Sequence, residues 1–213
     1  MDAKEATHHL ATIRKIMESA TQLTVMPAKA ALAGGILTLM GCGITRLELG
    51  TLNFDAMNHA HVSVRLFLIV VWAAVAILAT GTDMVLAVLT ARRCGQNPWY
   101  RFGKMAIYAM GPAVAVAGIL TVVLALQKQW QLVPGVWMLL YGTALWTASV
   151  MSVRASKLLA FAFFLGGVLA LFWLPDRALL LVGLTFGLGH IVFGIYLLAT
   201  SRDGAVSRAV SFE

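Results

Sequence analysis

Charged side chains are scarce in this chain of 213 residues. Lys, Arg, Asp and Glu together make up 12% of the sequence, whereas 60% of the residues are hydrophobic. A soluble domain carries about a quarter charged residues, so this composition cannot supply a surface that faces water on all sides. The apolar residues form continuous runs rather than alternating with polar ones, which excludes a membrane β-barrel. The sequence therefore predicts a polytopic α-helical membrane protein.

The sequence motifs of several common catalytic centres are also absent. The chain contains no His-Glu-x-x-His, no Gly-x-Ser-x-Gly, no P-loop and no closely spaced pair of carboxylates. Only nine residues are acidic, and one of them, Asp83, lies deep within an apolar run. Because an intramembrane hydrolase would have few groups to use, the sequence favours a protein that is not an enzyme.

Cysteine is nearly absent. Cys42 lies within the first apolar run and Cys94 lies in a basic loop after the second, at opposite faces of the expected membrane topology, so no disulfide is expected between them. The net charge of +7 comes from Lys and Arg residues beside the apolar runs. The positive-inside bias and contact with anionic lipid account for this charge, and nucleic-acid binding is not expected.

Six apolar runs are long enough to be transmembrane helices. They cover residues 28–44, 66–90, 102–126, 132–150, 155–174 and 178–200. The predicted fold class is all-α, an integral membrane bundle of six transmembrane helices over residues 27–200. A polar cytoplasmic tail is expected at 201–213.

Residues 1–26 form a separate predicted unit. Apolar residues recur at helical spacing from Leu10 to Ala20, while the charged residues lie largely on other faces. This pattern predicts an amphipathic helix that lies on the cytoplasmic membrane surface or against the bundle and ends before Pro27. Such a helix can also bind a cytoplasmic or membrane protein partner.

The basic residues indicate the orientation. Of the 16 Lys and Arg residues, 12 lie on the side of the membrane that is predicted to hold both termini. The four on the opposite side are Arg46, Arg65, Lys128 and Arg177. The positive-inside rule then places both termini in the cytoplasm of a multi-pass plasma-membrane protein.

Asp83 is the first candidate functional residue. It is the only charge between Leu66 and Thr90, and it shares a helical stripe with Ala76, Thr80 and Ala87. The carboxylate is therefore expected to face packed helices, where an acid must be paired or protonated. One interpretation is a proton or cation site. The other is an ion pair near the inner surface, with Lys104, Arg154 or Lys157 as the partner.

His190 is the second candidate. It shares a face with the glycines from Gly183 to Gly194, so it is expected to point into the bundle at about mid-membrane depth. The structural interpretation is a hydrogen bond to Tyr141 or Thr143 of the fourth span. A functional interpretation joins His190 to Asp83 in a proton relay.

Metal and haem sites are further alternatives. Asp55, His59 and His61 lie in the connection after the first span and are potential metal ligands, although their spacing matches no specific motif. A haem bound by His190 would need a second His at a suitable depth, and His59 and His61 are too shallow. No cofactor is predicted; haem and a metal ion remain open.

Three stretches resemble a family of small bacterial inner-membrane proteins: HLATIRKIMESA, WMLLYGTALW and GLGHIVFGIYLL. Members of this family are similar to the chain along nearly its whole length, with an amphipathic N-terminal helix and six spans. The family is uncharacterised and has no catalytic residues to transfer. The resemblance implies bacterial origin, a plasma-membrane location and an association with transcriptional regulators encoded nearby.

Three functional hypotheses follow from these observations. The first is a non-enzymatic module that binds a partner or senses a membrane condition, with residues 1–26 as the contact to a protein partner. The second is a small transporter or channel for a proton, a cation or an apolar solute, using Asp83 and His190. The third is a haem-binding electron carrier. Membrane lipids are expected partners in each case, and a homo-oligomer is left open.

Overall fold

The computed structural model describes residues 27–93, 102–149 and 154–210, and within these ranges it contains helices and turns but no strand. The all-α prediction is confirmed for this part of the chain. The amphipathic helix expected at residues 1–26 lies outside the described residues, as does Cys94.

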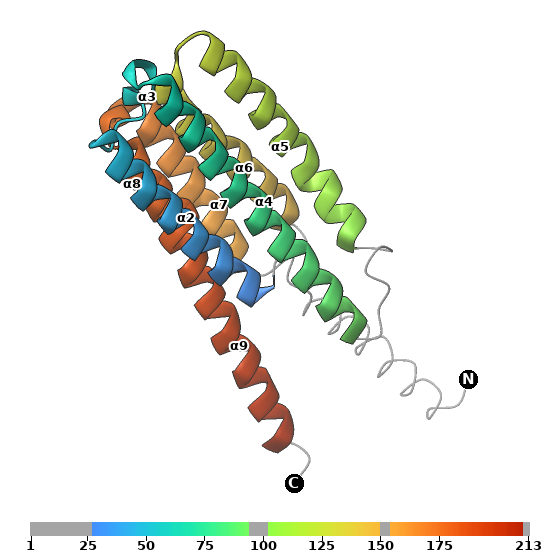
Figure 1. Cartoon of the computed structure of the whole chain (residues 1–213). Coiled ribbons are helices and arrows are strands. Elements are labelled where there is room, and N and C mark those ends of the chain that lie inside the picture. Colours follow the sequence, from blue (N-terminus) through green and yellow to red (C-terminus); the bar gives the residue numbers. More distant parts are fainter. Residues whose placement is uncertain (1–26, 94–101, 150–153, 211–213) are drawn as a thin grey trace.

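Long helices run along one common direction (Figure 1). The α-helices are α2 (Ala28–Leu49), α3 (Ala56–His59), α4 (Val62–Arg93), α5 (Phe102–Leu126), α6 (Val133–Ser149), α7 (Arg154–Val168), α8 (Ala178–Val182) and α9 (His190–Val210). Short 3₁₀ turns precede α6 and α8, namely η1 (Trp130–Leu132) and η3 (Pro175–Arg177). Two segments are π-helical: η2 (Leu169–Trp173) continues α7, and η4 (Gly183–Gly189) joins α8 to α9.

Five of these helical stretches are long and apolar enough to cross a membrane, which indicates a multi-pass membrane protein. They cover residues 28–49, 62–90, 108–126, 155–173 and 175–200. The run expected at residues 132–150 corresponds to α6, which has 17 residues and is not among the five. At the C-terminus α9 continues to Val210, so residues 201–210 of the expected polar tail are helical.

Backbone geometry sets where the first helix ends. Gly50 adopts a left-handed conformation with φ 66°, and its N–H donates to the carbonyl oxygen of Arg46 at 3.0 Å. This is the usual glycine stop of a helix, since a residue without a Cβ atom adopts positive φ without strain. The helix therefore runs five residues beyond the expected end at Ile44, because polar residues such as Glu48 remain helical where the apolar run has stopped.

The helices pack in a row rather than all against one another. α2 packs against α4 on one side and against η4 and α9 on the other, while α6 packs between α5 and α7. Contacts of α7 with η4 and α9, and of α6 with α8, join the two groups. α4 and α5 therefore stand at the two edges, and each rests mainly on one neighbour.

Glycine permits the closest helix contact in the bundle, between α2 and the continuous α8–η4–α9 rod. A Cβ atom at Gly35 would lie 2.6 Å from the carbonyl oxygen of Gly187, and one at Gly194 would lie 2.8 Å from that of Ala28. These distances are shorter than carbon and oxygen atoms can approach, so the two backbones touch only because no side chain separates them. The close approach expected from the glycine face of the last span is confirmed at Gly187 and Gly194.

We expect Gly35→Ala to lower the free energy of unfolding by about 1–3 kcal/mol, because the added methyl group overlaps backbone atoms that cannot move independently. The matched control is Gly43→Ala on the same helix, where a Cβ atom meets nothing within 4 Å. Unfolding of both variants in mixed detergent micelles, followed by tryptophan fluorescence, checks this. Equal stability of the two variants would contradict the role of the α2–α9 contact.

Candidate functional site

A hydrogen bond between a partly buried and a buried side chain joins helices α6 and α9. The hydroxyl group of Tyr141 on α6 lies 2.9 Å from Nε2 of His190, the first residue of α9. His190 is only 5% exposed, as expected for a residue on the glycine face. The sequence offered Tyr141 and Thr143 as partners, and the structure contains the bond to Tyr141. Thr143 is exposed and its hydroxyl group donates to the carbonyl oxygen of Leu139 in its own helix.

Aromatic rings surround this hydrogen bond. Tyr141 packs against Phe163 and Phe186 with ring centroids 4.9 Å apart in both cases, and Phe163 meets Phe186 edge-on at 4.5 Å. The ring of Phe186 is parallel to that of His190 within 4°. These contacts fix the orientation of the imidazole and exclude water from it.

The second nitrogen of His190 is less well satisfied. Nδ1 is buried and has no partner at hydrogen-bond geometry, although the backbone carbonyls of Thr185 and Phe186 lie beside the ring. Both carbonyls belong to the π-helical segment η4, in which each N–H bonds five residues back instead of four. The residue is therefore held by one interhelical hydrogen bond and by ring packing.

Asp83 lies on α4, away from this pair. Its side chain is half-buried, and Oδ1 is buried without a hydrogen-bond partner. Lys157, one of the three expected ion-pair partners, is exposed on α7, and the described residues contain no ion pair between it and Asp83. Lys104 and Arg154 lie in described helices, but their side chains are outside the described part.

The helical stripe of Asp83 does not face packed helices as expected. Ala76 and Thr80 are exposed, and Asp83 and Ala87 are half-buried. α4 instead meets α2 through a neighbouring stripe, in which Trp72 and Val75 approach Gly41 and Ala79 approaches Gly34. Asp83 lies on the flank of that contact, because it follows Ala79 by one turn and is rotated by about 40° from it.

Asp83 and His190, which the sequence suggested as a proton relay, lie at different depths in the bundle. Helix α2 contacts both α4 and α9, so positions along α2 allow depths on the two helices to be compared. Gly34 lies beside Ala79 of α4, and the next residue, Gly35, lies beside Ile191 of α9. His190 is therefore level with Ala79, and Asp83 lies about 6 Å further along α4. No hydrogen bond joins Asp83 to Tyr141 or His190 within the described residues.

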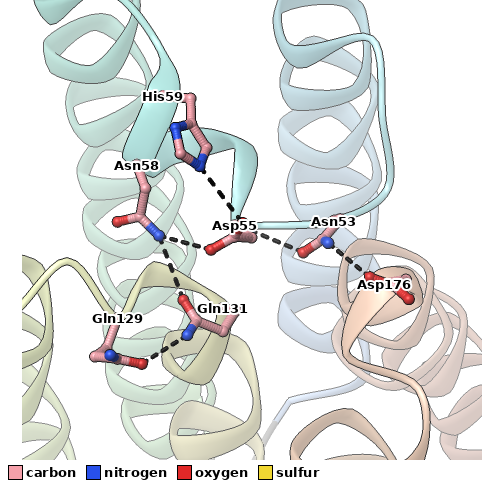
Figure 2. A network of polar contacts seen from close by, with 7 residues as sticks. All are labelled: Asn53, Asp55, Asn58, His59, Gln129, Gln131 and Asp176. Carbon is pink, nitrogen blue, oxygen red and sulfur yellow. Dashed lines mark hydrogen bonds and ion pairs between the residues drawn. The ribbon is translucent and has the colours of Figure 1, made fainter.

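A second polar cluster links the connections at one end of the bundle, which we call the turn end (residues 50–61, 127–132 and 174–177). Figure 2 shows its seven residues: Asn53, Asp55, Asn58, His59, Gln129, Gln131 and Asp176. Asn53 donates to Asp176 at 2.7 Å, and Asn58 donates to Asp55 at 2.7 Å and to Gln131 at 3.4 Å. The α2–α4 connection is thereby bonded to the other two turns.

This network accounts for two of the three residues that the sequence suggested as metal ligands. Oδ2 of Asp55 lies 3.8 Å from Nε2 of His59, and the other oxygen of Asp55 accepts from Asn58. His61 instead lies 2.8 Å from the hydroxyl group of Ser63. The described residues contain no group of three or more His, Cys, Asp or Glu side chains placed to hold a metal ion. The structure thus brings Asp55 and His59 together and leaves His61 apart.

The amide residues of the network had no signal in the sequence. Asn53, Gln129 and Gln131 are uncharged, lie in two different turns and belong to no motif. Their bonds depend on how three hairpins meet, and only the tertiary structure decides that.

We expect Tyr141→Phe to lower the free energy of unfolding by about 0.5–2 kcal/mol, the range for interhelical polar contacts in membranes. Phenylalanine keeps the ring contacts and removes only the hydroxyl group, so Nε2 of His190 would be left buried without a partner. Thr143→Val is the matched control, since its hydroxyl group makes no contact between helices. Thermal unfolding in detergent, followed by near-ultraviolet circular dichroism, measures both; similar losses would show that the interhelical bond contributes nothing.

Comparisons of the chain with models of protein families, with curated proteins and with solved structures gave no match.

Proposed function

We propose that this protein is a non-enzymatic module of a bacterial plasma membrane, and that it binds a protein partner through its membrane-embedded surface. The observation that carries the proposal is the contrast between a closely packed interior and two edge helices with one neighbour each. The bacterial location follows from the family resemblance of the sequence.

The interior offers little for transport or catalysis. Backbone contacts at Gly35 and Gly194 close the interface between α2 and α9. The hydroxyl groups of buried threonines in the described helices donate to carbonyl oxygens of their own helix, as at Thr38, Thr45 and Thr185. Because these hydroxyl groups already donate within their own helix, they do not form a continuous polar path for an ion or a solute.

The edge helices are available for contact instead. Apolar side chains of α4 and α5 point away from the rest of the chain, for example Ile77, which is 70% exposed, and Ile119, which is 65% exposed. Lipid can cover such residues, and so can the transmembrane helix of another protein. In Figure 1, α5 stands apart from the group formed by α2, α7 and α9, and the lower half of α4 diverges from that group.

We further infer that α6 is a sixth span and that both termini are cytoplasmic. α6 lies between α5 and α7, and together with η1 it extends from Trp130 to Ser149. An even number of spans agrees with the excess of Lys and Arg on the side of the termini.

Cysteine labelling in intact cells tests this topology. In a background with Cys42→Ala and Cys94→Ala, we expect an impermeant maleimide to label Gln127→Cys, at the turn end, and to leave Ser207→Cys unlabelled until the cells are permeabilised. The opposite pattern, or labelling of both sites in intact cells, would contradict the inferred orientation or the number of spans.

Site-specific photocrosslinking tests the partner. A photoreactive residue at Ile77 or Ile119 is expected to give one protein adduct of defined mass in native membranes. The same residue at Leu158 on α7, which is 72% exposed, is the control for non-specific neighbours and should give lipid adducts only. Lipid adducts alone at all three positions would contradict the proposal.

A second function is favoured by one observation: a carboxylate oxygen of Asp83 is buried without a hydrogen-bond partner inside an apolar span, in a bundle that also contains the bonded pair of Tyr141 and His190. On this alternative the three residues form part of a route for a proton or a cation. Purified protein in proteoliposomes would then conduct protons or alkali cations, and Asp83→Asn would abolish the flux without loss of folded protein. Haem ligation by His190 is not proposed, because Nε2 is already bonded to Tyr141 and Phe186 covers the ring.

A further inference from the structure

We propose that the N-terminal segment, residues 1–26, packs against the part of α4 that extends past the start of α2, and that it covers Leu86 and Leu89 with its own apolar face. The occupant of this surface is therefore a part of the same chain. The inference goes beyond the proposed function and does not depend on which partner the edge helices bind.

The first observation is a difference in length between two packed helices. The apolar span of α4 covers 29 residues, Val62–Thr90, whereas α2 has 22 residues. The two helices are antiparallel, and Gly34 of α2 lies beside Ala79 of α4. Ala28 precedes Gly34 by six residues, so the start of α2 is level with about Val85, six residues after Ala79. Beyond Val85, α4 has no α2 beside it. Figure 1 shows α4 and α9 continuing past the start of α2.

The second observation concerns the thickness of the membrane. Arg65 lies in the first turn of α4, at the turn end, and marks one edge of the hydrocarbon core. A core of about 30 Å is crossed by about 20 helical residues, so its other edge lies near Val85. Leu86 and Leu89 are then at or beyond that edge, where lipid tails do not cover them. A shift of α4 that brought both leucines into the core would also draw Arg65 into it.

The face of α4 that meets α2 continues past the end of their contact. Val75 and Ala79 approach glycines of α2, and Leu86 follows Ala79 by seven residues, which returns it to the same face of the helix. Leu89 lies one turn further along and is 43% exposed. Apolar side chains at this depth face headgroups and water unless protein covers them, and their burial is favourable.

Residues 1–26 are the segment that reaches this surface. They lie outside the described residues, and the sequence predicts an amphipathic helix for them, with apolar positions from Leu10 to Ala20 and a further one at Leu23. The segment ends at Pro27, directly before α2 begins. Its last residues are thus held close to Leu86 by the chain itself, and such tethering gives effective concentrations of order mM.

Charge favours this segment over a second copy of the chain. Lys29 near the start of α2 and Arg92 near the end of α4 are both exposed. Two copies related by a two-fold axis through this surface would bring these basic residues together, and like charges repel. Residues 1–26 contain three acidic residues and three residues that are Lys or Arg, so the segment carries no net charge that this basic end would repel.

Cysteine accessibility in the full-length protein tests the inference. Leu89→Cys is introduced in a background with Cys42→Ala and Cys94→Ala, and the purified protein is placed in phosphatidylcholine nanodiscs. The rate of reaction with a water-soluble maleimide then measures how well position 89 is covered. Size-exclusion profiles and tryptophan fluorescence confirm that each variant is folded.

Two sets of substitutions in the segment separate its apolar face from its polar face. With Ile13→Asn, Met17→Asn and Ala20→Asn together, we expect position 89 to react about tenfold faster, because the apolar face that covers it is lost. The matched control changes three charged residues of the same segment and should leave the rate unchanged: Arg14→Gln, Lys15→Gln and Glu18→Gln.

A disulfide crosslink identifies the chain that supplies the cover. Under mild oxidation we expect Leu23→Cys and Leu89→Cys to form a bond within one chain, since the two positions lie about 7 Å and 6 Å past the start of α2. The control pairs Leu23→Cys with Met84→Cys, which is 47% exposed on the opposite face of α4 and should give no such bond.

Equal labelling rates at position 89 in all three segment backgrounds would overturn the inference: fast rates would show that nothing covers Leu89, and slow rates that lipid does. A crosslink found only between two chains would also overturn it, in favour of a second copy. Photocrosslinking at Ile77, which lies in the span above this surface, tests the proposed function separately from either result.

Discussion

The direct contact of two helix backbones, α2 and the α8–η4–α9 rod, is the constraint on which the rest of the structure depends. A Cβ atom at Gly35 would lie 2.6 Å from the carbonyl oxygen of Gly187, and one at Gly187 would lie 2.5 Å from Cδ2 of Leu39 on α2. A lipid bilayer gives no hydrophobic driving force for helix association, because lipid tails are as apolar as leucine. Close packing of small residues supplies the association energy instead, and here it fixes the relative depth of the two helices.

The depth and rotation set by this contact place His190 in the interior. The glycine-rich segment before it is π-helical, which changes the direction of the helix face just where His190 meets Tyr141. Segments of this kind are rare and are frequent at functional sites. In this chain the π-helical segment η4 takes part in the packing of the last helical rod against α2, because Gly187 belongs to η4 and contacts α2.

The turn end is held by a different kind of interaction. Asn53 and Asn58 bridge three connections, and the backbone N–H of Leu179 donates to the carbonyl oxygen of Leu52 at 3.0 Å. Side-chain amides suit this location, because each donates and accepts without a charge that the membrane interface would have to solvate. The bundle is thus closed by polar bonds at one end and by backbone packing along its length, while α4 and α5 remain at the edges.

The sequence by itself determined the class of protein, the positions of the long helices and the two polar residues that lie deepest in the spans. Continuous apolar runs and glycine spacing are local properties of the chain, and they suggested that His190 faces the bundle, with Tyr141 or Thr143 as its partner. The sequence could not decide which face of α4 is covered. Asp83 shares a stripe with Ala76 and Thr80, which suggested packing, but the helix turns its neighbouring stripe to α2 and leaves this one open. Nor could the sequence predict that Asn53, Gln131 and Asp176 belong to one hydrogen-bonded network. Helical periodicity defines a face, but only the order in which helices pack decides what that face meets.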